Sequence, residues 1–183
     1  MRIERIQKKY NVAINFVQFP LHPETPEEGR PLEALFNCGP DEIAQKNQHM
    51  KGLMDAEGLP YGKRTHTYNS RKAQEIGKWA DTQPDGFRIH DALFRAYFVD
   101  TKNVADTDVL LAVCESVDLD ATAAKEVLEN GSFKQAVDDD WNKSRSYGVT
   151  GVPTYVVGQA GIIGAQPYEA IESLVIEAGA VEV

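Results

Sequence analysis

The sequence has little cysteine and no long apolar run. Its 183 residues include only two cysteines, Cys38 and Cys114, which lie far apart in the chain. This spacing excludes a disulfide-rich scaffold, a Cys-x-x-Cys redox pair and a cysteine-rich zinc site within the sequence. No stretch approaches the roughly 20 apolar residues of a membrane-spanning helix. The first ten residues, MRIERIQKKY, also lack the apolar core of a secretory signal.

Positive charge is scarce as well. Lys and Arg number 19 against 28 Asp and Glu, which gives a net charge of −9 at pH 7. A chain this acidic repels phosphate backbones and anionic lipid, so we expect neither nucleic acid nor a membrane surface as a partner. The 42% of apolar residues is enough for one hydrophobic core. The length fits one domain, or one domain with a large insertion.

The order of the predicted elements separates the ends of the chain from its middle. The first ten residues predict an amphipathic helix, and Val12–Phe19, VAINFVQF, predicts a buried strand. Helical patterns then fill residues 41 to 137, and Ser70, Asp106 and Asp120 are the expected N-caps. Near the C-terminus, Val152–Val157 and residues 162–163 predict an antiparallel hairpin, which a helix follows after Pro167. We therefore expect an α/β sheet platform, residues 1–31 and 148–183, interrupted by an all-helical insertion at about 40–147.

Four motifs in this order are similar to one family. GVPT and GAQPYEA near the C-terminus, with HPETPEEGRP and LFRAYF upstream, resemble the FrnE-like branch of the DsbA family. The resemblance runs the whole length of the chain. It implies a single thioredoxin-like domain over residues 1–183, thiol–disulfide oxidoreductase activity and a cytoplasmic location. The low cysteine count agrees with that compartment.

The resemblance also implies a substrate-binding segment at Thr150, Gly151, Val152 and Pro153. Most X-Pro bonds are trans, but the matching proline of this superfamily is cis. A cis bond at Pro153 would turn the backbone N–H and C=O of Val152 outward. These groups could then pair with an extended peptide, with a protein thiol or disulfide substrate, or with glutathione. No other cofactor is expected.

The matching families begin with an apolar strand and a Cys-x-x-Cys, and this sequence lacks both. We therefore assign no catalytic residue, and expect that the chain is N-terminally truncated or has lost the segment. Cys114 lies on an apolar helical stripe and is expected to be an inert core residue. Cys38, in the sequence NCGPD, is expected to be an incidental loop thiol, with a thiol acidified at a helix start as the alternative.

Three other groups of residues are expected to be structural. The four histidines have no ligand spacing, so no metal site is expected. The acidic run Asp138–Asp140 is expected to be a solvated helix face. The aromatic residues between Phe87 and Phe98 are expected to pack mainly in the core.

Two alternative functions stay open. One is a glutathione-dependent enzyme similar to 2-hydroxychromene-2-carboxylate isomerase or kappa-class glutathione transferase. The other is a non-catalytic module that binds peptides or oligomerises. In a thioredoxin topology the missing strand would lie between Val12–Phe19 and Thr154–Val157 and leave unpaired backbone groups on both sides. Direct strand pairing, a segment swapped from a second copy in a homodimer, or a bound strand would close the gap.

Overall fold

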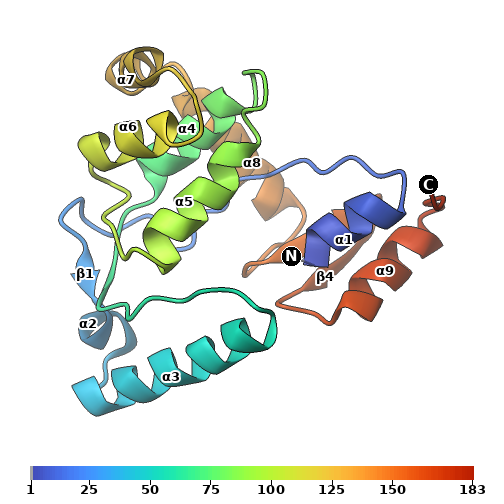
Figure 1. Ribbon diagram of the computed structural model, residues 1–183, viewed down its shortest axis with the longest axis horizontal. Helices are drawn as coiled ribbons and strands as arrows, with labels where there is room; N and C mark the ends of the chain where they lie inside the picture. Colours follow the sequence, from blue (N-terminus) through green and yellow to red (C-terminus); the bar gives the residue numbers. More distant parts are fainter. Residues whose placement is uncertain (1) are drawn as a thin grey trace. The chain divides into compact units, whose positions relative to one another are not determined.

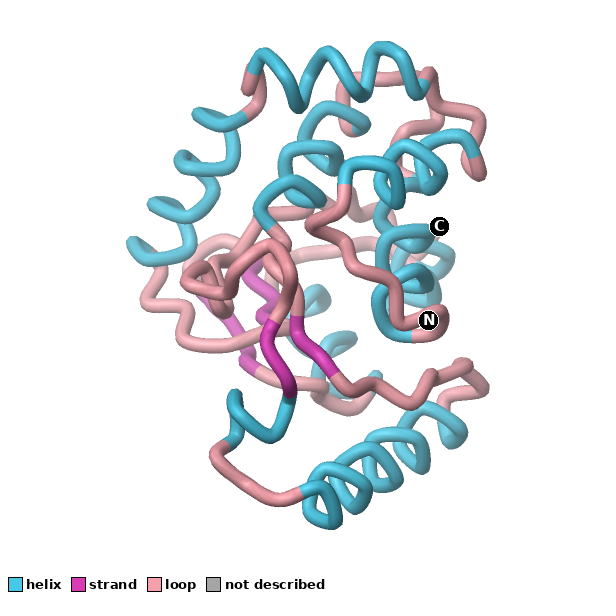
Figure 2. The backbone as a smooth tube through the Cα atoms, turned by 90° about the vertical axis from the view of Figure 1, so that its left-hand side faces the viewer, coloured by secondary structure: helices cyan, strands magenta, loops and turns pink. Residues whose placement is uncertain are grey.

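A computed structural model describes residues 2–183, in which helices predominate and all strands are short (Figure 2). The helices are α1 (Arg2–Lys9), α2 (Leu32–Phe36), α3 (Pro40–Ala56), α4 (Arg71–Ala80), α5 (Arg88–Phe98), α6 (Thr107–Glu115), α7 (Ala121–Asn130), α8 (Lys134–Ser146) and α9 (Tyr168–Glu177). The strands are β1 (Arg30–Pro31), β2 (His66–Thr67), β3 (Thr154–Val157) and β4 (Ala160–Ile163).

The chain divides into two units. Residues up to 21 and from 139 onward form one, here called the platform unit, and residues 22–138 form the other, the helical unit. One boundary lies in the proline-rich loop and the other within α8. The predicted platform ended at residue 31 and resumed at 148, so the observed unit has less of the loop and more of α8.

The helical unit has a continuous apolar core, and α4, α5, α6 and α7 lie together around it (Figure 1). Its buried residues are Ala73, Ile76, Trp79, Ala80, Ile89, Ala96, Val104, Leu110, Val113, Cys114, Leu119, Ala124 and Val127. Two of the predicted N-caps are confirmed: Asp106 accepts from the Asp108 N–H, and Asp120 accepts from the N–H groups of Thr122 and Ala123. Ser70 precedes α4 as predicted but makes no side-chain cap bond.

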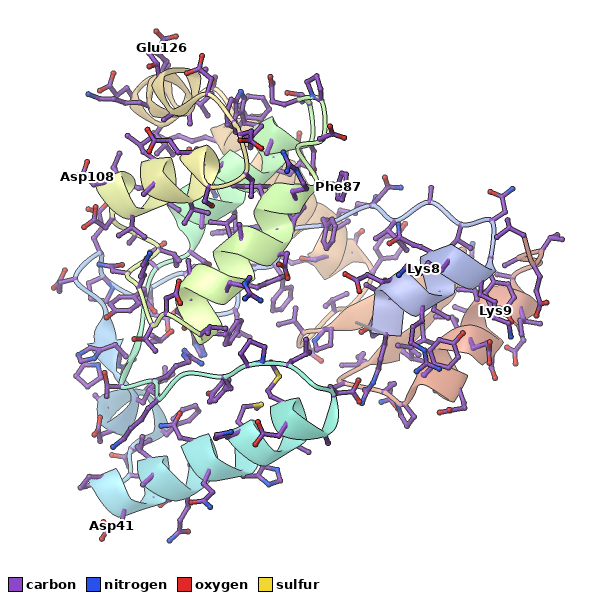
Figure 3. All side chains as sticks on the ribbon, viewed as in Figure 1. Lys8, Lys9, Asp41, Phe87, Asp108 and Glu126 are labelled. Carbon is purple, nitrogen blue, oxygen red and sulfur yellow. The ribbon has the colours of Figure 1, made fainter. Side chains whose placement is uncertain are left out.

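Helix α5 buries only part of the stripe that was expected in the core: Leu93 and Tyr97 pack against the core. Ile89 and Ala96 are buried, whereas Phe87 and Phe94 are 67% and 51% exposed. Phe87 projects at the start of the helix (Figure 3). Each phenylalanine precedes its buried counterpart by two positions, about 200° around the helix axis. The prediction of an aromatic core was therefore wrong for these two rings.

The acidic run Asp138–Asp140 is not simply a solvated face. In the helical unit, Asp138 Oδ1 accepts from Arg71 Nη1 at 2.6 Å, and Arg71 Nε donates to the buried Glu75 at 3.0 Å. In the platform unit, the buried Asp140 accepts from the backbone N–H of Gln18 at 3.0 Å. The prediction of a solvated face was wrong at the buried Asp140, whereas Asp138 stays half exposed within its ion pair. Sequence spacing does not show which distant donors reach a helix face.

The platform unit is built from α1, α9 and the β3–β4 hairpin. Ile6 and Tyr10 pack with Ile171 and Val175 as its buried core. The predicted hairpin is confirmed: β3 pairs antiparallel with β4 from Thr154↔Ile163 to Val157↔Ala160. The chain ends meet here as well, through an isolated bridge between Tyr10 and Glu182.

The strand predicted at Val12–Phe19 is wrong. This segment lies in the platform unit and forms no strand ladder with any part of residues 2–183. Its ends are held, because the Asn11 N–H donates to the Val181 carbonyl at 2.8 Å and Gln18 is bonded to Asp140. A β-branched sequence forms a strand only where a second strand lies beside it, and direct pairing with β3 does not occur.

Candidate functional site

The predicted substrate-binding segment leads into β3. The Val152–Pro153 peptide bond is cis, the conformation that the resemblance implies. Two hydrogen bonds hold its flanks: Thr154 Oγ1 donates to the Gly151 carbonyl, and the Gly164 N–H donates to the Pro153 carbonyl, both at 2.7 Å. The loop before β3 is therefore fixed from both sides.

Val152 is an exposed residue of this segment. Its side chain is 50% exposed. Its backbone N–H and C=O form no hydrogen bond within residues 2–183. A donor and an acceptor on one residue can together bind one residue of an extended chain, as an added strand does. Thr150 is also exposed and Gly151 is half-buried, so the predicted residues form one accessible stretch.

Neither cysteine is a candidate nucleophile. Both are unpaired thiols of the helical unit. Burial raises the pKa of Cys114 to about 11, which keeps it protonated at neutral pH, as expected for a core residue. The pKa of Cys38 is also raised, first by desolvation and then by the nearby Glu42 carboxylate. The alternative of an acidified thiol at Cys38 is therefore wrong.

A polar cluster joins α1 to α9 beside the platform core. Glu172 accepts from Lys9 Nζ at 2.9 Å, from the Tyr168 hydroxyl at 2.9 Å and from the Tyr10 hydroxyl at 3.0 Å. These donors lower the pKa of Glu172, the Lys9 ammonium having the largest effect. The cluster is a structural clamp, and sequence reasoning missed it because its members are separated by most of the chain.

Two further features are absent from the part of the chain that the structure describes. Residues 2–183 contain no group of three or more His, Cys, Asp or Glu side chains arranged to hold a metal ion. Among the same residues, no helix combines the length and the apolar character needed to cross a bilayer.

Comparison with known proteins places this geometry in a family. A family profile described as the DSBA-like thioredoxin domain matches residues 1–175. The uncharacterized protein YwbO of Bacillus subtilis (strain 168) is 28% identical over 94 residues, which are 49% of this chain and 46% of YwbO. The chain thus spans about half the length of that curated relative.

Two solved structures share the fold. One is a probable DsbA oxidoreductase of Streptomyces coelicolor, with a TM-score of 0.88 and 24% identity over 97% of this chain and 81% of that one. The other is a proposed protein disulfide isomerase of Nitrosomonas europaea, with a TM-score of 0.61 and 18% identity over 76% of this chain and 74% of that one. The architecture is the mixed α/β, thioredoxin-like fold of DsbA proteins. With a family profile that matches nearly its whole length, the chain belongs to the DSBA-like thioredoxin domain family.

Proposed function

We propose that this chain acts in thiol–disulfide exchange as a FrnE-like member of the DsbA family, and that Thr150–Pro153 binds the substrate polypeptide. The observation that carries the proposal is the exposed Val152, whose backbone N–H and C=O are both unpaired within residues 2–183. Family membership supplies the reaction class. Main-chain pairing at Val152 would hold many different polypeptides, because it does not depend on their side chains.

The exchange reaction needs two thiols that act in turn. A thiolate attacks one sulfur of the substrate disulfide, forms a mixed disulfide and releases the other sulfur as a thiolate. A second thiol then attacks the mixed disulfide, so that the substrate leaves reduced and the dithiol becomes a disulfide. Cys38 and Cys114 do not meet these needs, because the pKa of each thiol is raised. In our proposal this chain binds the substrate, and another segment or another protein supplies the dithiol.

The test measures the binding of a short peptide that carries one internal disulfide. Binding is monitored through the shifts of the backbone amide NMR signals of the chain. We expect the largest shift at Val152, and about fivefold weaker binding for Val152→Pro, which removes one backbone donor worth roughly 1 kcal/mol. Ile163→Pro, at an exposed site on the other strand of the hairpin, is the matched control and should bind within twofold of the original chain. Equal binding by both variants would remove Val152 from the site.

Glutathione is the second candidate ligand, because its cysteinyl residue carries the same backbone groups that an extended peptide presents to Val152. Titration with reduced glutathione tests it directly. Binding that Val152→Pro weakens, with no binding of the disulfide peptide, would favour the glutathione-dependent alternative over the oxidoreductase.

The location that we propose for this activity is the cytoplasm. It is supported by the low cysteine count and by the resemblance to the FrnE-like branch. Fractionation of the source cells, with immunodetection of the chain, tests it. Recovery with periplasmic or secreted proteins would contradict the assignment.

A further inference from the structure

Arg64 is a half-buried arginine of the helical unit that has no acidic partner among residues 2–183. A guanidinium has five N–H donors. Within the described chain only Nη2 of Arg64 is hydrogen-bonded, to the Tyr97 hydroxyl and to the His66 carbonyl at 3.4 Å. Nε is buried and donates to no atom of these residues, and the Nη1 group has no acceptor there either, although it is not buried. The N–H groups of both nitrogens are therefore unused.

Arg71, in the same unit, is fully hydrogen-bonded and provides the comparison. Its Nε donates to Glu75 at 3.0 Å, its Nη1 to Asp138 at 2.6 Å and its Nη2 to the Lys134 carbonyl at 2.8 Å. Every nitrogen has an acceptor, and two of the three acceptors are carboxylates. A buried N–H without an acceptor costs free energy, and the cost is larger on a charged group. Arg64 thus lacks the anion that would compensate for the partial burial of its charge.

The guanidinium of Arg64 is held in place by the surrounding structure. Its Cζ lies 4.3 Å from the centre of the Tyr97 ring and 5.1 Å from the centre of the Phe98 ring, both on α5. The backbone is held as well, because the Arg64 carbonyl accepts from Asn47 Nδ2 of α3 at 2.8 Å. These cation–π contacts and hydrogen bonds leave the side chain little rotamer freedom to lose when a ligand binds. Arg64 is therefore preorganised to donate to an anion.

The sequence around Arg64 supplies no competing carboxylate. Residues 58–74 contain no Asp or Glu, although the whole chain has 28 of these residues. Lys63, the preceding residue, is exposed and forms no ion pair within residues 2–183. On α5, Phe94 is 51% exposed, and the centre of its ring lies 6.3 Å from that of Phe98. A positive charge beside exposed aromatic carbon favours a ligand that is anionic at one end and apolar at the other.

We infer that Arg64 binds the carboxylate of an apolar organic acid. The accessible Nη1 group donates to the carboxylate, and the aromatic rings at the end of α5 contact the carbon chain of the acid. A carboxylate matches the guanidinium in planarity and in charge. A phosphate dianion fits less well, because only the exposed Lys63 is available for its second charge. All of these residues belong to the helical unit, so the site does not depend on the exchange reaction proposed above.

Titration of the intact chain with hexanoate tests the site, and hexanamide is the uncharged probe of nearly the same shape. The Nε–H signal of Arg64 in a nitrogen–proton NMR spectrum reports on the guanidinium itself. We expect hexanoate to shift this signal and those of Tyr97 and Phe98 in a saturable way, and hexanamide to bind at least tenfold more weakly. Equal binding of hexanamide, or tighter binding of inorganic phosphate, would overturn the carboxylate assignment. The absence of a saturable shift at Arg64 would overturn the site itself.

Variants of the chain locate the binding group. Arg64→Gln removes the charge and should weaken hexanoate binding at least tenfold. Arg88→Gln removes the same charge from an exposed position at the other end of α5, and should change binding less than twofold. Equal losses in these two variants would show a nonspecific attraction to positive charge and would overturn the inference.

Two conservative variants keep the test decisive if Arg64→Gln does not fold, which circular dichroism checks. Arg64→Lys keeps the charge but loses the planar fork, and should weaken hexanoate binding about fivefold. Tyr97→Phe keeps the ring but removes the hydroxyl that accepts from Nη2, and should weaken binding about threefold through a less ordered guanidinium. Unchanged binding in both folded variants would contradict the role given to Arg64.

Discussion

The two units of this molecule differ in how their backbone N–H and C=O groups are satisfied. In the helical unit the interior N–H and C=O groups of each helix are bonded within that helix, so packing needs mainly to cover an apolar face, and thirteen buried residues achieve this. The platform unit has a core of four buried residues, and its β3–β4 hairpin pairs with no further strand among residues 2–183. Strands need neighbours to satisfy their backbone groups, and the described part of the chain provides none here.

Charge is also used differently in the two units. The helical unit buries a carboxylate: Glu75 is only 2% exposed and depends on Arg71, which also binds Asp138. The platform unit keeps its main ionic cluster, around Lys9 and Glu172, near solvent and leaves the hairpin uncharged. We therefore expect mutations to act on stability mainly in the helical unit and on binding of the substrate polypeptide mainly in the platform unit.

The largest expected effect comes from breaking the buried ion pair. Arg71→Ala leaves the Glu75 carboxylate buried without its guanidinium partner, which should cost about 3–5 kcal/mol of unfolding free energy. Urea denaturation at pH 7 measures this cost. Lys9→Ala, in the exposed cluster of the platform unit, is the comparison and should cost clearly less. Equal losses would show that the two clusters contribute alike.

A cavity in the helical core should have the next largest effect. Leu110 is fully buried, and Leu110→Ala should lower the unfolding free energy by about 2–5 kcal/mol. Ile163→Ala removes a half-exposed side chain from the platform hairpin and should cost about 0.5 kcal/mol or less. Paired urea curves compare the two. A large loss at Ile163 would mean that another surface covers this residue in solution.

Two glycines of the helical unit provide a smaller contrast. A Cβ at Gly86 would lie 1.7 Å from the Ala80 carbonyl oxygen, so Gly86→Ala should cost about 1–3 kcal/mol by forcing the backbone to shift. In α3, a Cβ at Gly52 meets nothing within 4 Å. Gly52→Ala should stabilise the chain by roughly 0.5–1 kcal/mol. Thermal unfolding monitored by circular dichroism resolves the opposite signs.

The smallest expected effect is a pH-dependent change in stability at the polar cluster around Lys9 and Glu172 in the platform unit. The pKa of folded Glu172 lies below its ordinary value of 4.5, chiefly because Lys9 donates to it. Its contribution is therefore present above pH 4.5 and disappears as pH falls through the folded pKa. Glu172→Gln should be less stable than the original chain at pH 7, with a difference that shrinks toward pH 3.

Urea midpoints at several pH values measure this change. Tyr168→Phe removes only the second donor to Glu172 and should show the same trend with a smaller amplitude. A stability difference that stays constant from pH 7 to pH 3 would contradict the role given to the carboxylate.

The helical half of the fold was largely predictable from sequence, because helix signals are local. Asp106 and Asp120 mark the starts of α6 and α7, and Gly131 ends α7 with a φ of 62°. The hairpin was predictable for the same reason, since its turn at Gly158 lies between its two strands. The two-residue strands β1 and β2 were missed, because nothing local in a proline-rich loop indicates a partner at His66.

The sequence-based predictions that were wrong concern structure that depends on contacts between residues far apart in the chain. Val12–Phe19 has strand composition, but the strand that it needs is not provided by residues 2–183. Of the candidate site, the segment Thr150–Pro153 came from family resemblance. The exposure of Val152 and its unpaired backbone groups needed the observed structure. The alternative of an acidified Cys38 was wrong because desolvation, and after it the Glu42 carboxylate, raises the pKa of this thiol.

The contact between the two ends of the chain has a practical consequence. The Val183 N–H donates to the Lys9 carbonyl at 3.1 Å, only the length of α1 away from Arg2. The last carbonyl of α1 is thus bonded by the backbone of Val183. Deleting residues 181–183 should therefore loosen the end of α1 and destabilise the platform unit, and should leave the core of the helical unit intact.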